Sequence, residues 1–255
     1  MKIYRVKYKK KIFYGILKEE CLYPLEGSPF RSFKVKNVCV PIGDVKILPP
    51  VKPSKIVAIG VNYKDHAMER GKSLPKEPLV FLMPPSAVCG PNDIIIYPKM
   101  AKRVDFEGEL AVVIKKRAHL LSVDDDVEKY ILGYTCFNDV TARDLQERDV
   151  QFTRAKSFDT FAAFGPCVVS GIDSAHLKVK TFLNGKLRQS GNTNNLIFSV
   201  PYCIRFVSNI MTLNPGDIIT TGTPSGVGPM IPGDRVDVQI EGIGTLSNVV
   251  MSIKK

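Results

Sequence analysis

The feature that most constrains the fold is a short run of alternating acids, Asp105, Glu107 and Glu109, followed at once by the apolar residues 110–114. Side chains on a β-strand alternate between its two faces, so acids two apart share one face. On a helix, residues two apart do not face each other, and this spacing would form no cluster. The β-branched residues after Glu109 also favour a strand. The run therefore predicts a β-strand with three carboxylates on one face.

Three carboxylates on one strand face repel one another unless a cation lies among them. Carboxylate oxygens are the ligands that hard divalent ions such as Mg²⁺, Mn²⁺ or Ca²⁺ prefer. The alternative is the solvated outer face of an edge strand, where acidic side chains are common. The run alone leaves a metal site and a solvated face both open.

Composition sets wider limits on the class of protein. The chain has 255 residues, enough for one large domain or for a large domain with a small one. It has no apolar run near the roughly 18 residues that span a bilayer, and its N-terminus lacks the apolar core of a signal peptide. We therefore expect a cytoplasmic protein without a membrane partner. None of the six cysteines forms a C-x-x-C pair, so a zinc site made of thiolates is not expected. Disulfides are not expected either, because the cytoplasm keeps thiols reduced.

The formal net charge of +11 raises the alternative of a basic nucleic-acid-binding protein. The basic residues are spread along the chain, and their densest groups, residues 9–11 and 115–117, carry no helix-turn-helix, RNP or zinc-finger pattern. A lysine-rich surface that serves solubility or heat resistance explains the excess as well. We expect no nucleic-acid partner.

The order of the elements indicates a mostly β protein with short helices, of the α+β class. Residues 3–17 are typical of a hairpin, and a stiff proline-rich segment, residues 49–53, follows further short strands. We place a domain boundary in that segment. It separates a small N-terminal β domain, residues 1–52, from a main domain, residues 53–255.

Several signals in the main domain are strong. An Asn184-Gly185 turn predicts a hairpin, and residues 199–210 predict an amphipathic helix that Ser199 caps. Apolar runs predict further strands, most of them buried, at residues 56–59, 79–82, 94–96 and 130–137.

A helix is predicted directly after the strand that ends at Gly60. It covers residues 62–71, with Asn62 as a candidate N-cap. His66 and Glu69 are three residues apart and share a face of this helix. A Glu beside a His orients the ring and raises its basicity, as a general base needs. The alternative is an exposed His in a surface ion pair.

Other polar residues follow the later strands. Asp139 lies where a strand turns into a helical segment. Arg143 and Gln146 share a face of that segment. They could hold a carboxylate and a carbonyl of a ligand, or they could face solvent. Lys156 has small or apolar neighbours and is either functional or a structural lysine with a buried stem. The Gly-rich residues 218–229 either let the backbone approach a ligand or form a surface turn, and they lack a P-loop motif.

Taken together, five segments resemble the fumarylacetoacetate hydrolase family, in its acylpyruvate hydrolase and 2-hydroxyhepta-2,4-diene-1,7-dioate isomerase-like branch. They occur in the family's order and cover the chain from about residue 55 to its C-terminus. The resemblance implies a fumarylacetoacetate hydrolase-type mixed β-sandwich roll, usually dimeric, so we expect a homodimer. The segments are residues 60–69, 105–110, 138–146, 156–159 and 221–228.

The resemblance also implies roles for particular residues. It leaves Asp105 outside the set of metal ligands. The matching metal ligands are Glu107, Glu109 and Asp139, the catalytic residues are His66, Glu69 and Lys156, and the substrate-binding residues are Arg143, Gln146 and Thr223.

The implied chemistry is that of a metal-dependent enzyme acting on a small anionic 2-oxo acid, with Mg²⁺ (or Mn²⁺, or Ca²⁺) as cofactor. Lys156 would add positive charge beside a developing oxyanion, and His66, oriented by Glu69, would take a proton. Our first expectation is a hydrolase that cleaves a C–C bond of a 2,4-dioxo acid of the acylpyruvate type. A decarboxylase or an isomerase, acting for example on oxaloacetate or on 2-hydroxyhepta-2,4-diene-1,7-dioate, would use the same site, and both stay open.

Overall fold

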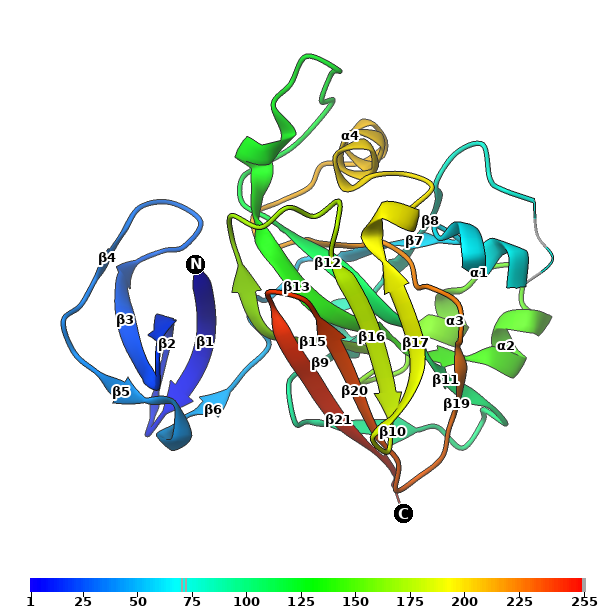
Figure 1. Cartoon of the computed structure of the whole chain (residues 1–255), viewed down its shortest axis with the longest axis horizontal. Helices are drawn as coiled ribbons and strands as arrows, with labels where there is room; N and C mark the ends of the chain where they lie inside the picture. The colour runs from blue at the N-terminus through cyan, green and yellow to red at the C-terminus, as the bar shows by residue number, and fades with distance from the viewer. Residues whose placement is uncertain (70, 72, 254–255) are drawn as a thin grey trace.

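The computed structural model describes residues 1–69, 71 and 73–253, and β-strands make up most of its regular structure (Figure 1). This confirms the predicted mostly β class with short helices. The strands are β1 Lys2–Tyr8, β2 Lys11–Lys18, β3 Cys21–Gly27, β4 Phe33–Val35, β5 Val40–Pro41, β6 Lys46–Ile47, β7 Ile56–Gly60, β8 Leu79–Met83, β9 Val88–Cys89, β10 Ile94–Tyr97, β11 Val104–Phe106, β12 Gly108–Ile114, β13 Ile131–Asp139, β14 Thr141–Ala142, β15 Ala162–Val169, β16 Lys178–Leu183, β17 Lys186–Asn192, β18 Ile218–Thr220, β19 Gly228–Met230, β20 Arg235–Ile240 and β21 Gly244–Ser252. The α-helices are α1 Lys64–Glu69, α2 Arg143–Arg148, α3 Thr153–Lys156 and α4 Val200–Ile210, and the 3₁₀ turns are η1 Ile42–Asp44, η2 Pro85–Ala87, η3 Val127–Tyr130 and η4 Thr193–Asn195.

The central sheet is built around buried apolar strands. Its main path runs β4-β3-β2-β1-β15-β13-β12-β18-β7-β8. Every residue of β12 and β13 is buried, because hydrophobic clusters cover both faces of the sheet. Leu110 and Val112 of β12 pack in one cluster, and Ala111 and Val113 pack in the other. The antiparallel pairing of β12 with β13 sets Gly108 opposite Asn138, so the start of β12 lies beside the end of β13.

A second sheet, ordered β10-β21-β20-β16-β17, packs on one face of the central sheet. The predicted hairpin is β16–β17, and Asn184 and Gly185 both have the positive φ that its tight turn requires. Val179 of β16 and Val238 of β20 share a cluster with Val112 of β12. Burial of each such side chain contributes roughly 1.5–3 kcal/mol. A small third sheet, β14-β11-β19, completes the roll in the described part of the chain.

The predicted helix 199–210 is α4. The Ser199 hydroxyl accepts a hydrogen bond from the Tyr202 amide at 3.4 Å, and a proline occupies the first turn. Val200, Ile204 and Val207 are buried on its inner face. Among the described residues, no helix combines the length and the apolar character that a membrane crossing requires.

The N-terminal strands lie at the opposite end of the molecule from α1 and α2 (Figure 1). β1 and β2 form the predicted antiparallel hairpin. β1 also joins the main sheet, because Lys2 lies opposite Val169 of β15 and Ile3 packs in the same hydrophobic cluster as Phe164. The division into residues 1–52 and 53–255 stays a prediction.

Cys21 and Cys39 form a disulfide, so the expectation that no disulfide would form was wrong for this pair. The pairing of β3 with β5, which sets Cys21 opposite Pro41, brings the two Cα atoms to 5.3 Å. The two cysteines are 18 positions apart in the sequence, and no sequence signal joins them. The other four cysteines are buried thiols.

One further expectation was wrong in detail. The strand at residues 79–82, expected to be buried, is not buried, because β8 ends the path of the central sheet and leaves Leu79 and Leu82 exposed. Lys156 is the last residue of helix α3.

Candidate active site

The acidic run is not one continuous strand. β11 ends at Phe106 and belongs to the small sheet, whereas β12 begins at Gly108 and belongs to the central sheet. Glu107 lies at the break, where its amide donates to Asn138 Oδ1 at 2.9 Å and its carbonyl accepts from the Asp139 amide at 2.9 Å. The break therefore fixes Glu107 against the end of β13, where Asp139 lies.

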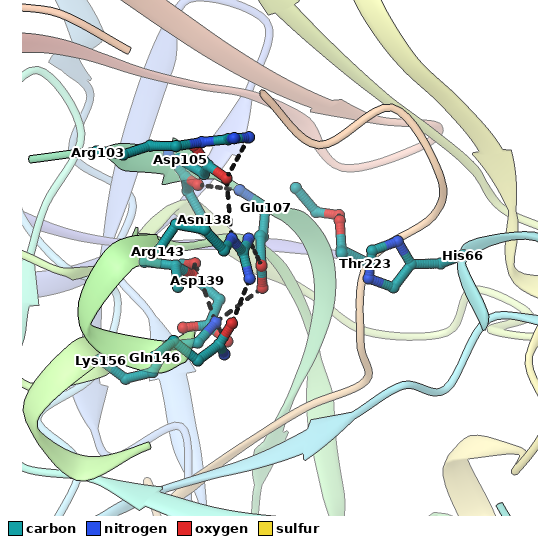
Figure 2. Close-up of polar contacts among 12 residues, drawn as sticks. His66, Arg103, Asp105, Glu107, Asn138, Asp139, Arg143, Gln146, Lys156 and Thr223 are labelled. Carbon is teal, nitrogen blue, oxygen red and sulfur yellow. Dashed lines mark hydrogen bonds and ion pairs between the residues drawn. The ribbon is translucent and has the colours of Figure 1, made fainter. Parts of the chain in front are cut away.

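This arrangement brings Glu107, Glu109 and Asp139 together. One carboxylate oxygen from each lies within 4.8 Å of the others. The three residues are between 2% and 6% exposed, which rules out the solvated outer face as an explanation of the acids. The expectation that Asp105 would share their face was wrong: it points instead toward two arginines (Figure 2).

Lys156 offsets much of the buried negative charge. Its Nζ lies 2.7 Å from a Glu107 oxygen and 2.6 Å from an Asp139 oxygen (Figure 2). The lysine is almost completely buried. Burial by itself would lower the pKa of Lys156, but the charges of Asp139 and Glu107 raise it above its ordinary value. The ammonium group therefore stays protonated and fixed between two carboxylates.

The three carboxylates do not share the same electrostatic environment. Burial, together with the charges of Asp139 and Glu107, raises the pKa of Glu109 well above its ordinary value. Burial also raises the pKa of Asp139 to about 6, even though Lys156 opposes the shift. For Glu107, burial alone would raise the pKa, but Lys156 and Arg143 hold it well below its usual range. The buried negative charge is therefore only partly compensated by these side chains.

The donor set fits a hard divalent cation. The three side chains offer only oxygen ligands, which such ions prefer. Oδ1 of Asp139 is buried and has no hydrogen-bond partner among the described residues, so one oxygen of the cluster is left for another ligand. A divalent ion at Glu107, Glu109 and Asp139 would supply the charge that this cluster lacks.

Arg143 links the acidic run to helix α2. Its Nε donates to Asp105 at 2.9 Å, and its other nitrogens donate to Glu107 and to Oε1 of Gln146 (Figure 2). Asp105 is also held by Arg103 at 2.8 Å. Asp105 thus fixes the guanidinium group of Arg143, while Arg143 and Gln146 both line the same pocket as the acids.

The pocket is small and has an apolar wall. Its volume is about 60 Å³, and its polar lining residues are His66, Glu107, Glu109, Asp139, Arg143, Gln146, Lys156 and Thr223. Ile59, Phe81 and Phe152 also line it, and the two phenylalanine rings meet edge to face at 5.3 Å. The pocket is therefore lined partly by charged side chains and partly by hydrophobic ones.

Helix α1 brings His66 to this pocket from the side opposite Lys156 and Gln146 (Figure 2). Nδ1 of His66 lies 3.1 Å from Glu69 Oε2, so the predicted pair is formed, and His66 is buried rather than exposed. Glu69 also accepts from the Gly226 amide at 3.1 Å. Asp65 accepts from the Ser225 hydroxyl at 3.1 Å. Two acids of α1 thus attach it to the Gly-rich loop.

Asn62 was expected to cap α1, and this was wrong. Its Nδ2 donates to the carbonyls of Phe198 and Thr221, and its Oδ1 accepts from the Phe198 amide at 2.8 Å. The helix begins at Lys64 instead. Asn62 therefore joins β7 to the Gly-rich loop. The predicted end of the helix includes residue 70, which lies outside the described residues.

The Gly-rich loop reaches the acids through its backbone. Gly222 has φ +87°, and its amide donates to Glu109 Oε2 at 2.8 Å. A Cβ at this position would lie 2.9 Å from Asn62 Cβ, so a larger residue does not fit. Thr223 follows and lines the pocket. The start of the loop therefore lines the pocket rather than forming an exposed surface turn.

Sequence reasoning missed Gln189. This residue of β17 has no exposed surface and contacts both Gly108 and Thr223. β17 carries no alternating hydrophobic pattern, so nothing in the sequence indicated that this side chain points inward.

Comparison with known proteins agrees with this geometry. The family model described as fumarylacetoacetate (FAA) hydrolase C-terminal matches residues 55–251, and one described as Rv2993c-like, N-terminal, matches residues 1–50. The chain belongs to the fumarylacetoacetate hydrolase family.

Three relatives illustrate the range of the family. Oxaloacetate tautomerase YisK of Bacillus subtilis is 46% identical over 224 residues, which cover 82% of this chain and 74% of the relative. The crystal structure of 2-hydroxyhepta-2,4-diene-1,7-dioate isomerase from Mycobacterium marinum has a TM-score of 0.92 and 39% identity, and all of both chains is covered. Maleylpyruvate hydrolase from Sphingobium, solved with manganese(II) and pyruvate, has a TM-score of 0.83 and 28% identity, again over all of both chains. The relatives are enzymes of more than one reaction type.

Proposed function

We propose that this protein is a divalent-metal-dependent enzyme that interconverts the enol and keto forms of a small 2-oxo dicarboxylic acid of the oxaloacetate type. The observation that carries the proposal is the buried cluster of Glu107, Glu109 and Asp139, which shares one pocket with Lys156 and His66. The 46% identical tautomerase and the 39% identical isomerase support proton transfer as the reaction.

Each of the site residues would have a distinct role. Glu107, Glu109 and Asp139 would hold the ion, Mg²⁺ or Mn²⁺, which when bound acts as a Lewis acid toward the oxygens of a 2-oxo acid. Lys156 supplies a second positive charge beside those oxygens, which stabilises the negative charge that develops there during proton transfer. Gln146 and Arg143 line the same pocket and would hold the anionic end of the substrate.

His66 is the residue placed to move the proton. Glu69 accepts from Nδ1, which leaves Nε2 as the basic nitrogen of the ring. His66 would carry a proton between carbon 3 of the substrate and its enol oxygen. The pocket volume of about 60 Å³ is far below the roughly 300 Å³ at the lower end of common ligand sites. We infer that a four-carbon acid suits it better than a seven-carbon dioate.

Hydrolysis of an acylpyruvate, our first expectation from the sequence, is the second candidate. The observation that favours it is the His66–Glu69 pair, which could take a proton from water as well as from carbon. The 28% identical maleylpyruvate hydrolase supports the same idea.

The deciding experiment compares enol-to-keto conversion of oxaloacetate, its decarboxylation and the cleavage of acetylpyruvate, each with Mg²⁺ or Mn²⁺ and after treatment with EDTA. We expect metal-dependent tautomerisation to be the fastest of the three. Faster cleavage of acetylpyruvate would favour the hydrolase. Full activity after removal of the metal with EDTA would contradict both.

A further inference from the structure

Gln189 has a fixed amide orientation. Its Oε1 accepts from the Gly108 amide at 2.9 Å, and its Nε2 donates to the Pro224 carbonyl at 2.8 Å. A backbone N–H can only donate and a backbone carbonyl can only accept, so the side-chain amide cannot be turned round. The second hydrogen of Nε2 is directed at Thr223 Oγ1, at 2.8 Å.

These contacts fix the directions of the hydrogen bonds that the Thr223 hydroxyl makes. It accepts from Gln189, and it donates its only proton to the Gly108 carbonyl at 2.9 Å. A hydroxyl oxygen has one proton and two lone pairs. One lone pair is therefore left, and Thr223 can accept a hydrogen bond from a ligand in the pocket but has no proton to donate.

Close packing keeps this network in place. A Cβ at Gly191 of β17 would lie 2.5 Å from Pro224, and a Cβ at Gly226 would lie 2.2 Å from the Arg188 carbonyl. A Cβ at Gly108 would lie 2.1 Å from Thr181 Oγ1. The Gly-rich loop is thus pressed against β17 on both sides of Gln189, and little room is left for another arrangement.

We propose that Gln189 is a positioning residue that makes Thr223 a hydrogen-bond acceptor toward the substrate. A ligand that presents an O–H group to Thr223, such as an enol or a 2-hydroxy acid, is then favoured over one that presents a keto oxygen. This inference rests on the proposed function, because it concerns which form of the 2-oxo acid the same site prefers.

The test measures the binding of lactate and pyruvate in the presence of Mn²⁺ by calorimetry. The two anions differ at carbon 2, where lactate carries a hydroxyl and pyruvate a keto oxygen. Thr223→Val, which keeps the side-chain shape, should raise the ratio of the lactate to the pyruvate dissociation constant by about 2- to 10-fold. Gln189→Met should change the ratio in the same direction, because the Thr223 hydroxyl could then turn and donate. A general loss of order in the site would weaken the binding of both ligands and leave the ratio of their dissociation constants unchanged.

Gln189→Leu is the second variant if Gln189→Met does not fold, since it also removes the donor to Thr223 without adding a new acceptor. Gln239→Met, an exposed position on β20, is the matched control and should leave the ratio at the wild-type value. An unchanged ratio in the Thr223 and Gln189 variants, or one that falls, would overturn this inference alone. Failure of wild-type protein to bind either anion with Mn²⁺ would overturn the proposed function as well.

Discussion

At the scale of single residues, the site is a balance of buried charges. Lys156 contacts two carboxylates, and Arg143 contacts Asp105 and Glu107. Glu109 contacts neither cation directly and instead accepts from the Gly222 amide. Removing a carboxylate should therefore affect metal binding more than it affects the fold.

The first prediction concerns the three carboxylates. Glu109→Gln should weaken Mn²⁺ binding by more than the roughly 10- to 100-fold that loss of a supporting group costs, and activity should fall with it. The metal-free fold should be retained, because burial and the two neighbouring acids already disfavour the charged form of Glu109, which a neutral Gln replaces. Glu107→Ala and Asp139→Ala should also lose the metal.

Calorimetry with Mn²⁺ and circular dichroism check these outcomes, with Asp124→Asn, an exposed acid, as the control. Wild-type affinity in all three variants would contradict the metal site.

The second prediction concerns substrate charge. Arg143→Ala should raise KM for an anionic 2-oxo acid by about 10- to 100-fold, which is the usual worth of a charge-assisted hydrogen bond. It should also destabilise the protein, because Asp105 stays buried and loses one of its two arginines. Steady-state kinetics and chemical unfolding measure the two effects. Arg148→Ala, on the exposed side of the same helix, is the control. An unchanged KM would remove Arg143 from substrate binding.

At the scale of elements, α1 is tied to the Gly-rich loop by Asp65 and Glu69. These contacts hold His66 over the pocket, and Gly60 and Gly71 flank the segment. We propose that α1 acts as a lid over bound substrate, because His66 of this helix lines the pocket.

The third prediction tests the role of α1 in proton transfer. His66→Ala should lower kcat by about 10²- to 10⁴-fold, while Mn²⁺ affinity stays unchanged. Glu69→Gln should have a smaller effect, because the ring keeps a hydrogen-bond partner. Rates with oxaloacetate and with acetylpyruvate would show which reaction depends more strongly on His66. Lys64→Ala, exposed on the same helix, should match wild type. Near-wild-type rates of His66→Ala on both substrates would exclude His66 from the mechanism.

The fourth prediction concerns the start of β7 and β18. Asp217 has no exposed side-chain surface and accepts from Ser54, Lys55 and Asn214, so it joins the chain before β7 to the turn before β18. Burial alone would raise the pKa of Asp217, but the bonds from Lys55 and Ser54 lower it below its ordinary value. Its contribution to stability is therefore complete above the unfolded-state pKa of about 4 and is lost as pH falls through the lower folded-state value.

Asp217→Asn should thus cost about 2–4 kcal/mol of unfolding free energy at pH 7, and the difference from wild type should shrink steadily below about pH 4. Urea unfolding at a series of pH values measures it. Asp44→Asn, an exposed acid, should show no such dependence. A difference that persists unchanged at the lowest pH would contradict the assigned cause.

At the scale of the whole molecule, β3 and β5, which the Cys21–Cys39 disulfide links, lie at the end opposite α1 and α2, which carry His66 and Arg143 (Figure 1). The fifth prediction follows from this separation. The double variant Cys21→Ser with Cys39→Ser should lose about 3 kcal/mol of stability, as expected for opening a loop of this length, with unchanged kcat and KM. Unfolding with and without a reductant checks the result, and the reductant should have no further effect on the double variant. A matching loss of activity would show that the two ends are coupled.

The homodimer and the absence of a nucleic-acid partner stay predictions.

The sequence by itself determined the elements and most of the chemistry. Alternation in residues 105–109 and β-branching in residues 110–114 indicated a strand, Asn184-Gly185 a hairpin, and Ser199 the start of a helix, because these signals are local in the chain. The five ordered segments identified the family for the same reason, since each is a short run of characteristic residues.

Only the tertiary structure decided how these pieces meet. The break at Glu107 sends Asp105 to the arginines and the two glutamates to Asp139, and it depends on two different sheets pairing on either side of it. Gln189, Asn62 and the Cys21–Cys39 disulfide act through partners 18 to 159 residues away in sequence. Contacts over such distances are set by strand register and by packing, which periodicity along the chain does not encode.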